Sequence, residues 1–153
     1  MAITRTASRF ALVGVALAAV VSLSACTPVG NAAITNYPGW PEVSMPGEGG
    51  SGELADGTPH AMWIGDGGKL AVITYGSSTC PVVGTTIDVV AKAGAGNAVK
   101  VNTADIPADR PCTMDLVAHT TEFWTPQNIT TTEPLVVEVA GSTIEVPVKG
   151  AAE

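Results

Sequence analysis

The fold class is indicated most directly by residues 60–75, HAMWIGDGGKLAVITY. Two extended segments, residues 60–64 and 69–75, flank a Gly-Asp-Gly-Gly turn, and a short glycine-rich turn between such segments is a strong signal for a β-hairpin. Within the second segment, Leu70-Ala71-Val72-Ile73 is apolar on both faces, which is typical of a central strand covered on two sides. We therefore expect a hairpin whose second strand lies inside a sheet.

Later segments continue this pattern, because apolar and polar residues alternate with the two-residue period of strands and no helical period follows residue 26. The seven expected strands are residues 60–64, 69–75, 85–93, 99–102, 116–125, 135–139 and 143–148. Pro147 cannot donate to a β-ladder, so the last strand is expected at a sheet edge. We predict an all-β fold, a small antiparallel β-sandwich or barrel of about seven strands, with Trp63, Phe123 and Trp124 as core aromatics.

Residues 1–25 have the composition of an export signal. Arg5 and Arg9 precede residues 10–21, an apolar run of twelve. Because a helix needs roughly 20 apolar residues to cross a bilayer, this run is too short for a comfortable permanent anchor. The small residues that a signal peptidase requires then follow, so we expect the leader to be removed.

Leu23-Ser24-Ala25-Cys26 resembles the lipobox of bacterial lipoproteins, in which the leader is cut just before a cysteine. The resemblance implies that Cys26 receives a thioether-linked diacylglycerol and becomes the mature N-terminus, on the extracytoplasmic face of the cell membrane. Two acyl chains hold a protein stably at a membrane, whereas one chain does so only marginally. The alternative is a secreted protein in which Cys26 is an incidental cysteine.

The charge balance excludes some classes of partner. Loss of Arg5 and Arg9 with the leader changes the formal net charge from −7 to −9. Such a chain lacks the basic surface that binds nucleic acid, and it repels anionic head groups, so contact with the membrane is expected through the lipid anchor. No cofactor is expected, and two paired cysteines with two distant histidines offer no recognised metal-site spacing.

The mature chain divides into a tether and a body. Residues 26–58 are expected to be a lipidated cysteine followed by a flexible tether, since residues 27–58 hold four prolines and seven glycines. A flexible chain of about 30 residues reaches roughly 30 Å end to end. Within it, Tyr37-Pro38-Gly39-Trp40-Pro41 is either a recognition segment or an arm that docks onto the body. Residues 59–153 are expected to form one β-rich extracytoplasmic domain.

Cys80 and Cys112 are the two cysteines that remain once Cys26 is assigned to lipid. In an exported protein an even pair of cysteines predicts a disulfide. Closing a loop of about 33 residues would stabilise the domain by roughly 3–4 kcal/mol in the chain-entropy model.

Gly76-Ser77-Ser78-Thr79-Cys80-Pro81 and Cys112-Thr113-Met114-Asp115-Leu116 resemble paired G-S-S-x-C-P and C-T-x-D motifs. Such motifs recur about 30 residues apart in small lipoproteins of high-GC Gram-positive bacteria, and the resemblance covers most of residues 61–148. It implies a shared structural plan, and it supplies no catalytic residues.

Three interpretations of these motifs stay open. The favoured one is structural, because serine, threonine and aspartate side chains satisfy turn amides. In the second, a disulfide brings together a polar binding site formed by Ser77, Ser78, Arg110, Asp115 and His119. The third is a Ser–His–Asp hydrolase drawn from the same residues, although no G-x-S-x-G elbow is present. His60 and His119 are each expected in a strand, with side chains that are either hydrogen-bonded within the protein or exposed to solvent.

The function we expect is therefore that of a binding or envelope-associated module of a lipid-anchored protein, with a protein or small-molecule partner that the sequence does not identify. A surface hydrolase that uses the polar end near the disulfide is one alternative. A structural accessory of a membrane complex is the other, and it predicts an exposed apolar patch.

Overall fold

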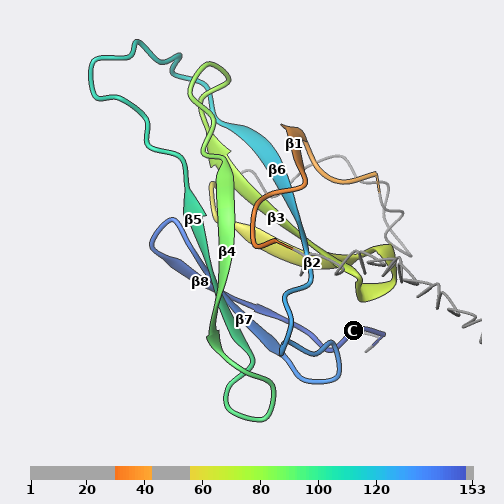
Figure 1. Ribbon diagram of the computed structural model, residues 1–153. Coiled ribbons are helices and arrows are strands. Elements are labelled where there is room, and N and C mark those ends of the chain that lie inside the picture. Colours follow the sequence, from red (N-terminus) through yellow and green to blue (C-terminus); the bar gives the residue numbers. More distant parts are fainter. Residues whose placement is uncertain (1–29, 43–55, 151–153) are drawn as a thin grey trace, which may run out of the picture.

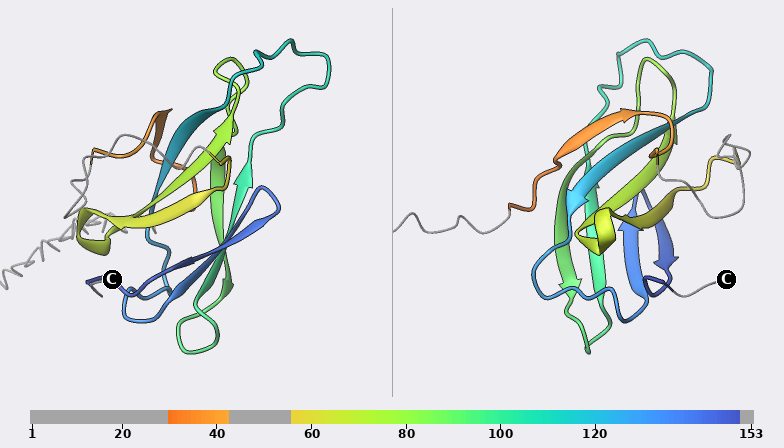
Figure 2. Two further views of the ribbon diagram at one scale, coloured as in Figure 1. Left: turned by 180° about the vertical axis from the view of Figure 1, so that it is seen from behind. Right: turned by 90° about the vertical axis from the view of Figure 1, so that its right-hand side faces the viewer.

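The computed structural model describes residues 30–42 and 56–150, which form two four-stranded β-sheets packed face to face (Figure 1, Figure 2). The elements are β1 (Thr35–Pro38), β2 (His60–Ile64), the 3₁₀ turn η1 (Gly65–Gly67), β3 (Lys69–Gly76), β4 (Gly84–Ala91), β5 (Ala98–Thr103), β6 (Val117–Trp124), β7 (Leu135–Val139) and β8 (Ser142–Val146). The predicted all-β class is confirmed, with eight strands in the described residues.

Sheet I has the strand order β1-β6-β3-β2, and sheet II has the order β4-β5-β7-β8. Neighbouring strands are antiparallel except for β5 and β7, which pair in parallel. The parallel pair arises because the chain leaves β5, passes through β6 in the other sheet and returns as β7. A parallel pair needs such a long crossover, whereas a hairpin turn can only join antiparallel strands.

The hairpins that the sequence predicts are present. β2 pairs with β3 from His60 opposite Ile73 to Ile64 opposite Lys69, and the η1 turn that joins them holds Asp66 at a positive φ of 56°. β4 pairs with β5, and β7 pairs with β8. β8 lies at the edge of sheet II and ends directly before Pro147. An edge position was predicted because proline has no backbone amide hydrogen to donate.

The core lies between the two sheets. It is formed by apolar side chains that are at most 3 % exposed: Leu70, Val72, Ile87, Val99, Val101, Phe123, Leu135, Val137, Val139 and Val146. Phe123 of β6 crosses to sheet II so closely that a Cβ placed on Gly84 would lie 2.8 Å from its Cζ. A glycine at this position therefore lets the largest core side chain reach β4.

Not all three aromatic residues that were expected in the core are buried there. Phe123 is completely buried, whereas its neighbour Trp124 is 45 % exposed, because successive strand residues point to opposite faces. Trp63 is partly buried against the core, and its indole Nε1 donates to the carbonyl of Pro147 at 3.1 Å. Trp124 is thus not a core aromatic.

An N-terminal arm, residues 30–42, joins the two sheets. The amide of Ala33 donates to Thr85 at 2.9 Å, and the amide of Ile87 donates to the carbonyl of Asn31 at 2.8 Å, so the arm starts along β4. It then continues as β1, which pairs antiparallel with β6. An unpaired sheet edge presents free amide and carbonyl groups, and the arm satisfies such groups on both sheets.

Within the expected tether, residues 30–42 differ from the expectation, because this segment lies against the body and Thr35–Pro38 pair with β6. Docking as an arm is the alternative that the structure shows for Tyr37–Pro41, since Gly39 also donates to Ala118 at 2.9 Å. The proline of β1 lies at the last position of an edge strand, where a missing amide removes no ladder hydrogen bond. The leader, Cys26 and residues 43–55 lie outside the described residues.

Candidate functional site

The predicted disulfide joins the turn after β3 to the loop before β6. Cys80 and Cys112 are bonded, with their Cα atoms 5.6 Å apart. Around them, the amide of Cys80 donates to the hydroxyl of Ser77 at 3.0 Å, and the guanidinium of Arg110 donates to the carbonyl of Thr79 at 2.7 Å. The disulfide is therefore part of a hydrogen-bonded link between two turns.

Ser78, Thr113 and Asp115 form the second half of this link. The amide of Ser78 donates to Asp115 Oδ1 at 3.0 Å, the hydroxyls of Ser78 and Thr113 lie 3.1 Å apart, and Thr113 also donates to Asp115. Hydrogen bonds from Ser78 and Thr113 to the carboxylate lower the pKa of Asp115 to about 2. These polar groups satisfy one another in exposed turns, as turn-stabilising side chains do.

The two histidines do not join that cluster. His119 is buried in β6, where its Nε2 lies 3.3 Å from Asn36 Oδ1 on the arm, and burial lowers its pKa. The ring of His60 lies 5.2 Å from that of Trp40 and 6.4 Å from that of Tyr75. Within residues 30–42 and 56–150, neither histidine hydrogen-bonds a serine, so these residues form no Ser–His pair.

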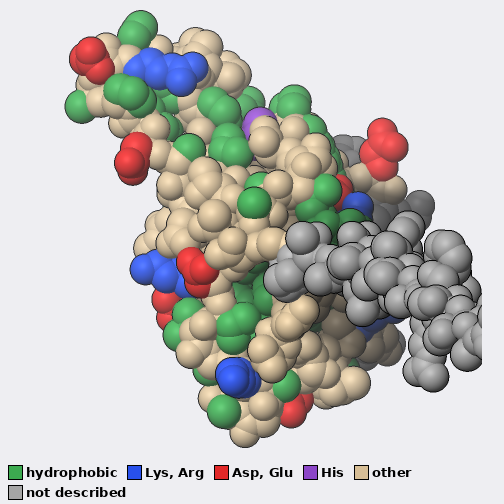
Figure 3. All heavy atoms as spheres, viewed as in Figure 1, with side chains coloured by type: hydrophobic (Ala, Val, Ile, Leu, Met, Phe, Trp, Pro, Cys, Tyr) green, Lys and Arg blue, Asp and Glu red, His purple; other side chains and the backbone are tan. Residues whose placement is uncertain are grey.

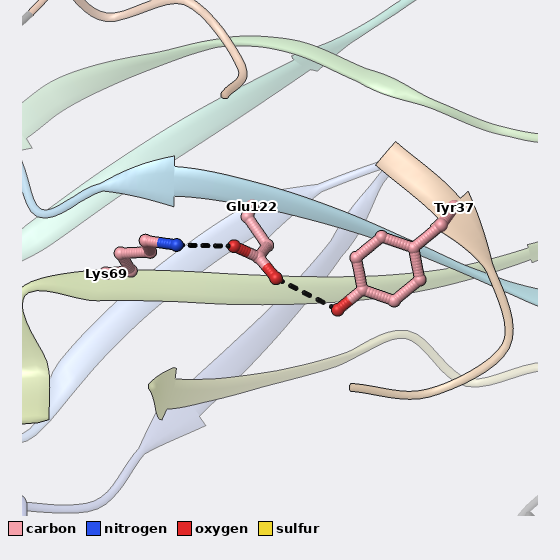
Figure 4. Close-up of polar contacts among 3 residues, drawn as sticks. All are labelled: Tyr37, Lys69 and Glu122. Atoms are coloured by element: carbon pink, nitrogen blue, oxygen red, sulfur yellow. Dashed lines mark hydrogen bonds and ion pairs between the residues drawn. The ribbon is translucent and has the colours of Figure 1, made fainter. Parts of the chain in front are cut away.

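A different polar group lies on the outer face of sheet I, where three strands meet. The phenol of Tyr37 in β1 donates to Glu122 Oε1 at 3.0 Å, and Lys69 Nζ of β3 lies 3.0 Å from Glu122 Oε2 (Figure 4). Strand register places them, since Thr35 is opposite Glu122 and Lys69 is opposite Trp124. The side chain of Glu122 is 13 % exposed, so this carboxylate is held between two donors in a largely buried setting.

The arm creates a hollow beside this group, with a volume of about 510 Å³. Its lining residues are Tyr37, Pro38, Trp40, Pro41, Glu42, Ile64 and Glu122. The hydroxyl of Thr120 donates to the carbonyl of Gly39 at 2.6 Å, which fixes the turn of the arm over the sheet. Ligand pockets in proteins commonly have volumes of about 300–1,000 Å³, so the hollow is large enough for a small ligand.

An exposed aromatic ring extends the same face. Lys69 Nζ lies 5.5 Å from the centre of the Trp124 ring, within the range of a cation–π contact. Lys69 is thereby engaged on two sides, by the carboxylate of Glu122 and by the indole of Trp124. The face thus offers aromatic rings and carboxylates, while its lysine is already paired.

No family model, curated protein or solved structure matches this chain. The roles of its residues are therefore argued from geometry alone. In the described part of the chain, no group of three or more His, Cys, Asp or Glu side chains could hold a metal ion. Nor do those residues include a helix that is long and apolar enough to cross a bilayer.

The sequence marks the segment that holds Tyr37 and Trp40 as a candidate for recognition, but no motif in it marks Lys69 or Glu122. The contact between Tyr37 and Glu122 joins residues 85 positions apart. It depends on the pairing of β1 with β6, which no turn connects. Glu122 is the only charged residue of β6, and that is the one signal the sequence offers for it.

The phenol of Tyr37 provides a test of this geometry. Burial, the hydrogen bond to Glu122 and the charges of Glu122 and Glu42 raise the pKa of Tyr37 to about 12. The folded protein therefore holds this proton more tightly than the unfolded chain does. The resulting contribution to stability is complete below about pH 10 and is lost as the pH rises through about 12.

We expect alkaline titration of tyrosinate absorbance to show a late step that disappears in Tyr37→Phe and shifts to lower pH in Glu122→Gln. Tyr75 is the other tyrosine, and burial raises its pKa as well, so the Tyr37→Phe protein serves to assign the two steps. A late step that survives in Tyr37→Phe would show that Tyr37 is not the shielded phenol.

Proposed function

We propose that this protein is a lipid-anchored extracytoplasmic binding module whose ligand site is the hollow between the N-terminal arm and sheet I. The hollow, with two aromatic rings and two carboxylates at its lining, is the observation that carries the proposal. Concave sites with a few converging polar groups are where proteins usually bind small ligands. The lipobox-like residues 23–26 and the disulfide, a bond typical of oxidising compartments, support the location.

A binding role is favoured over catalysis by the arrangement of the polar side chains. A Ser–His–Asp hydrolase requires a histidine within hydrogen-bond reach of the serine nucleophile. His119 instead contacts Asn36, and the hydroxyls of Ser77 and Ser78 are occupied by turn hydrogen bonds. The polar end near the disulfide therefore supports turn structure better than hydrolysis.

Mass spectrometry of the intact, detergent-extracted protein tests the anchor. We expect a mature chain that starts at Cys26, carries added diacylglycerol mass and gains two hydrogens on reduction of Cys80–Cys112. A Cys26→Ala variant, which keeps the leader but lacks the acceptor thiol, is the control and should carry no lipid. Native protein without lipid mass would contradict the anchor.

A thermal-shift survey with neutral saccharides, organic cations and organic anions tests the hollow. We expect at least one of these classes to raise the melting temperature of the native protein, because a ligand that binds only the folded state stabilises it. The same ligands should have much less effect on a Trp40→Leu variant. Equal shifts in both proteins would place the binding elsewhere.

A second candidate, an accessory that docks on another envelope protein, is favoured by one observation. The loop between β5 and β6 exposes three large apolar side chains, with Ile106 at 40 %, Leu116 at 53 % and Met114 fully exposed. Hydrophobic side chains gather at this end of the molecule (Figure 3). Exposed apolar patches often mark protein contacts.

A further inference from the structure

The hollow between the arm and sheet I, we propose, binds an organic cation, either a quaternary ammonium or the charged end of a lysine or arginine side chain. This inference rests on the binding role proposed above and adds the chemical class of the ligand. The geometry that carries it is the placement of two carboxylates and two aromatic rings around one open space.

The charged groups at the hollow favour a positive ligand. Glu42 and Glu122 both line it, and no lysine or arginine does. Lys69 pairs with Oε2 of Glu122 and with the ring of Trp124, so the carboxylate of Glu42 supplies the unpaired negative charge. Glu42 makes no hydrogen bond or ion pair with any described residue, so its charge remains available to a ligand.

The aromatic residues favour a cation that is soft and weakly hydrated. A cation within about 6 Å of a tyrosine or tryptophan ring is attracted by the negative face of the ring. The Tyr37 ring is fixed by its hydrogen bond to Glu122, and the Trp40 ring rests against His60 at 5.2 Å. Both rings are thus positioned before any ligand arrives, which reduces the entropic cost of binding.

The remaining lining residues suit the carbon part of such a ligand. Pro38, Pro41 and Ile64 supply apolar surface beside the two rings. A tetraalkylammonium group, or a guanidinium with its methylene chain, combines a diffuse charge with apolar atoms. A small anion would instead meet the unpaired carboxylate of Glu42 and no unpaired cation among the lining residues, so the same surface disfavours it.

Calorimetric titration of the full-length native protein in detergent tests the ligand class. The probes are choline, its uncharged analogue 3,3-dimethylbutan-1-ol, and the peptide acetyl-Gly-Arg-Gly-amide. We expect choline or the peptide to bind at least tenfold more tightly than the uncharged alcohol, and to lose affinity as the salt concentration rises. Tighter binding of choline would indicate a free small cation, and tighter binding of the peptide would indicate a polypeptide side chain.

Matched variants locate the site. Glu42→Gln removes one charge from the lining and should weaken binding of the cation several-fold. Glu138→Gln removes another exposed charge, on the outer face of sheet II, and should leave binding unchanged. Trp40→Leu should weaken binding by about two- to thirtyfold, the range that cation–π contacts span.

Equal affinities for choline and the uncharged alcohol, with none for the arginine peptide, would overturn the proposal. So would identical effects of Glu42→Gln and Glu138→Gln. If a neutral saccharide binds and is lost in Trp40→Leu, the cation proposal fails while the binding role stands. Absence of lipid on Cys26 would remove the anchor and leave the cation measurements valid.

Discussion

Replacing Phe123 with alanine should lower the free energy of unfolding by about 3–5 kcal/mol, the usual cost of deleting a buried phenylalanine. Phe123 is fully buried between the sheets, and its ring lies against the backbone of Gly84, in the same core cluster as Val101. The glycine cannot fill the resulting cavity, so little relaxation is available. Urea denaturation followed by circular dichroism measures the loss.

The next residue supplies the control. Trp124→Ala removes a larger side chain from the opposite face of the same strand, where the indole is 45 % exposed. We expect a loss of about 1 kcal/mol or less, since the half-exposed indole contributes mainly its cation–π contact with Lys69, and such contacts at exposed sites are worth about 0.5–1 kcal/mol. Equal losses for the two variants would mean that β6 does not present Phe123 to the core and Trp124 to solvent.

Replacing both Cys80 and Cys112 with serine should destabilise the protein by roughly 3–4 kcal/mol, because the unfolded chain regains the freedom of a loop of about 33 residues. For a domain of this size, such a loss corresponds to a fall in melting temperature on the order of 10–25 °C. The disulfide lies just beyond the end of the β3–β6 ladder, where Gly76 is opposite Val117, so most of its effect is expected through the unfolded chain. Differential scanning calorimetry of the oxidised, reduced and substituted proteins measures it.

Two comparisons separate the covalent link from the hydrogen bonds around it. Reducing the native protein should reproduce most of the loss, whereas Ser77→Ala, which removes the acceptor for the Cys80 amide, should cost only about 1–2 kcal/mol. An unchanged melting temperature after reduction would contradict a stabilising disulfide.

The sheet hairpins could be predicted because their information is local. In β7, Leu135, Val137 and Val139 are buried while Glu138 is exposed, as the two-residue alternation of the sequence predicts. The η1 turn after β2 is set by its glycines and Asp66, which adopt positive φ values over only three residues. Turn chemistry and alternation act over a few residues, so both can be read along the chain.

The arm and the candidate site could not be predicted in the same way. β1 pairs with a strand more than 80 residues away, and it lies in a segment whose prolines and glycines suggest an extended tether. Trp124 adjoins Phe123 in sequence, and only the register of β6 decides which of the two faces the core. Glu122 belongs to the candidate site because it contacts Tyr37 and Lys69, which lie on two other strands.

The arm also sets how far the body can stand from its proposed anchor. The described residues begin at Gly30, and four peptide units separate it from Cys26, so the two Cα atoms can be at most about 14 Å apart. The connection between a lipidated Cys26 and the body would therefore be short, and it would lead directly into the arm that lines the hollow. Such a protein would rest against the head groups with limited freedom to tumble, and a force on the lipid would load the hydrogen bonds of the arm to β4 first and those of β1 to β6 next.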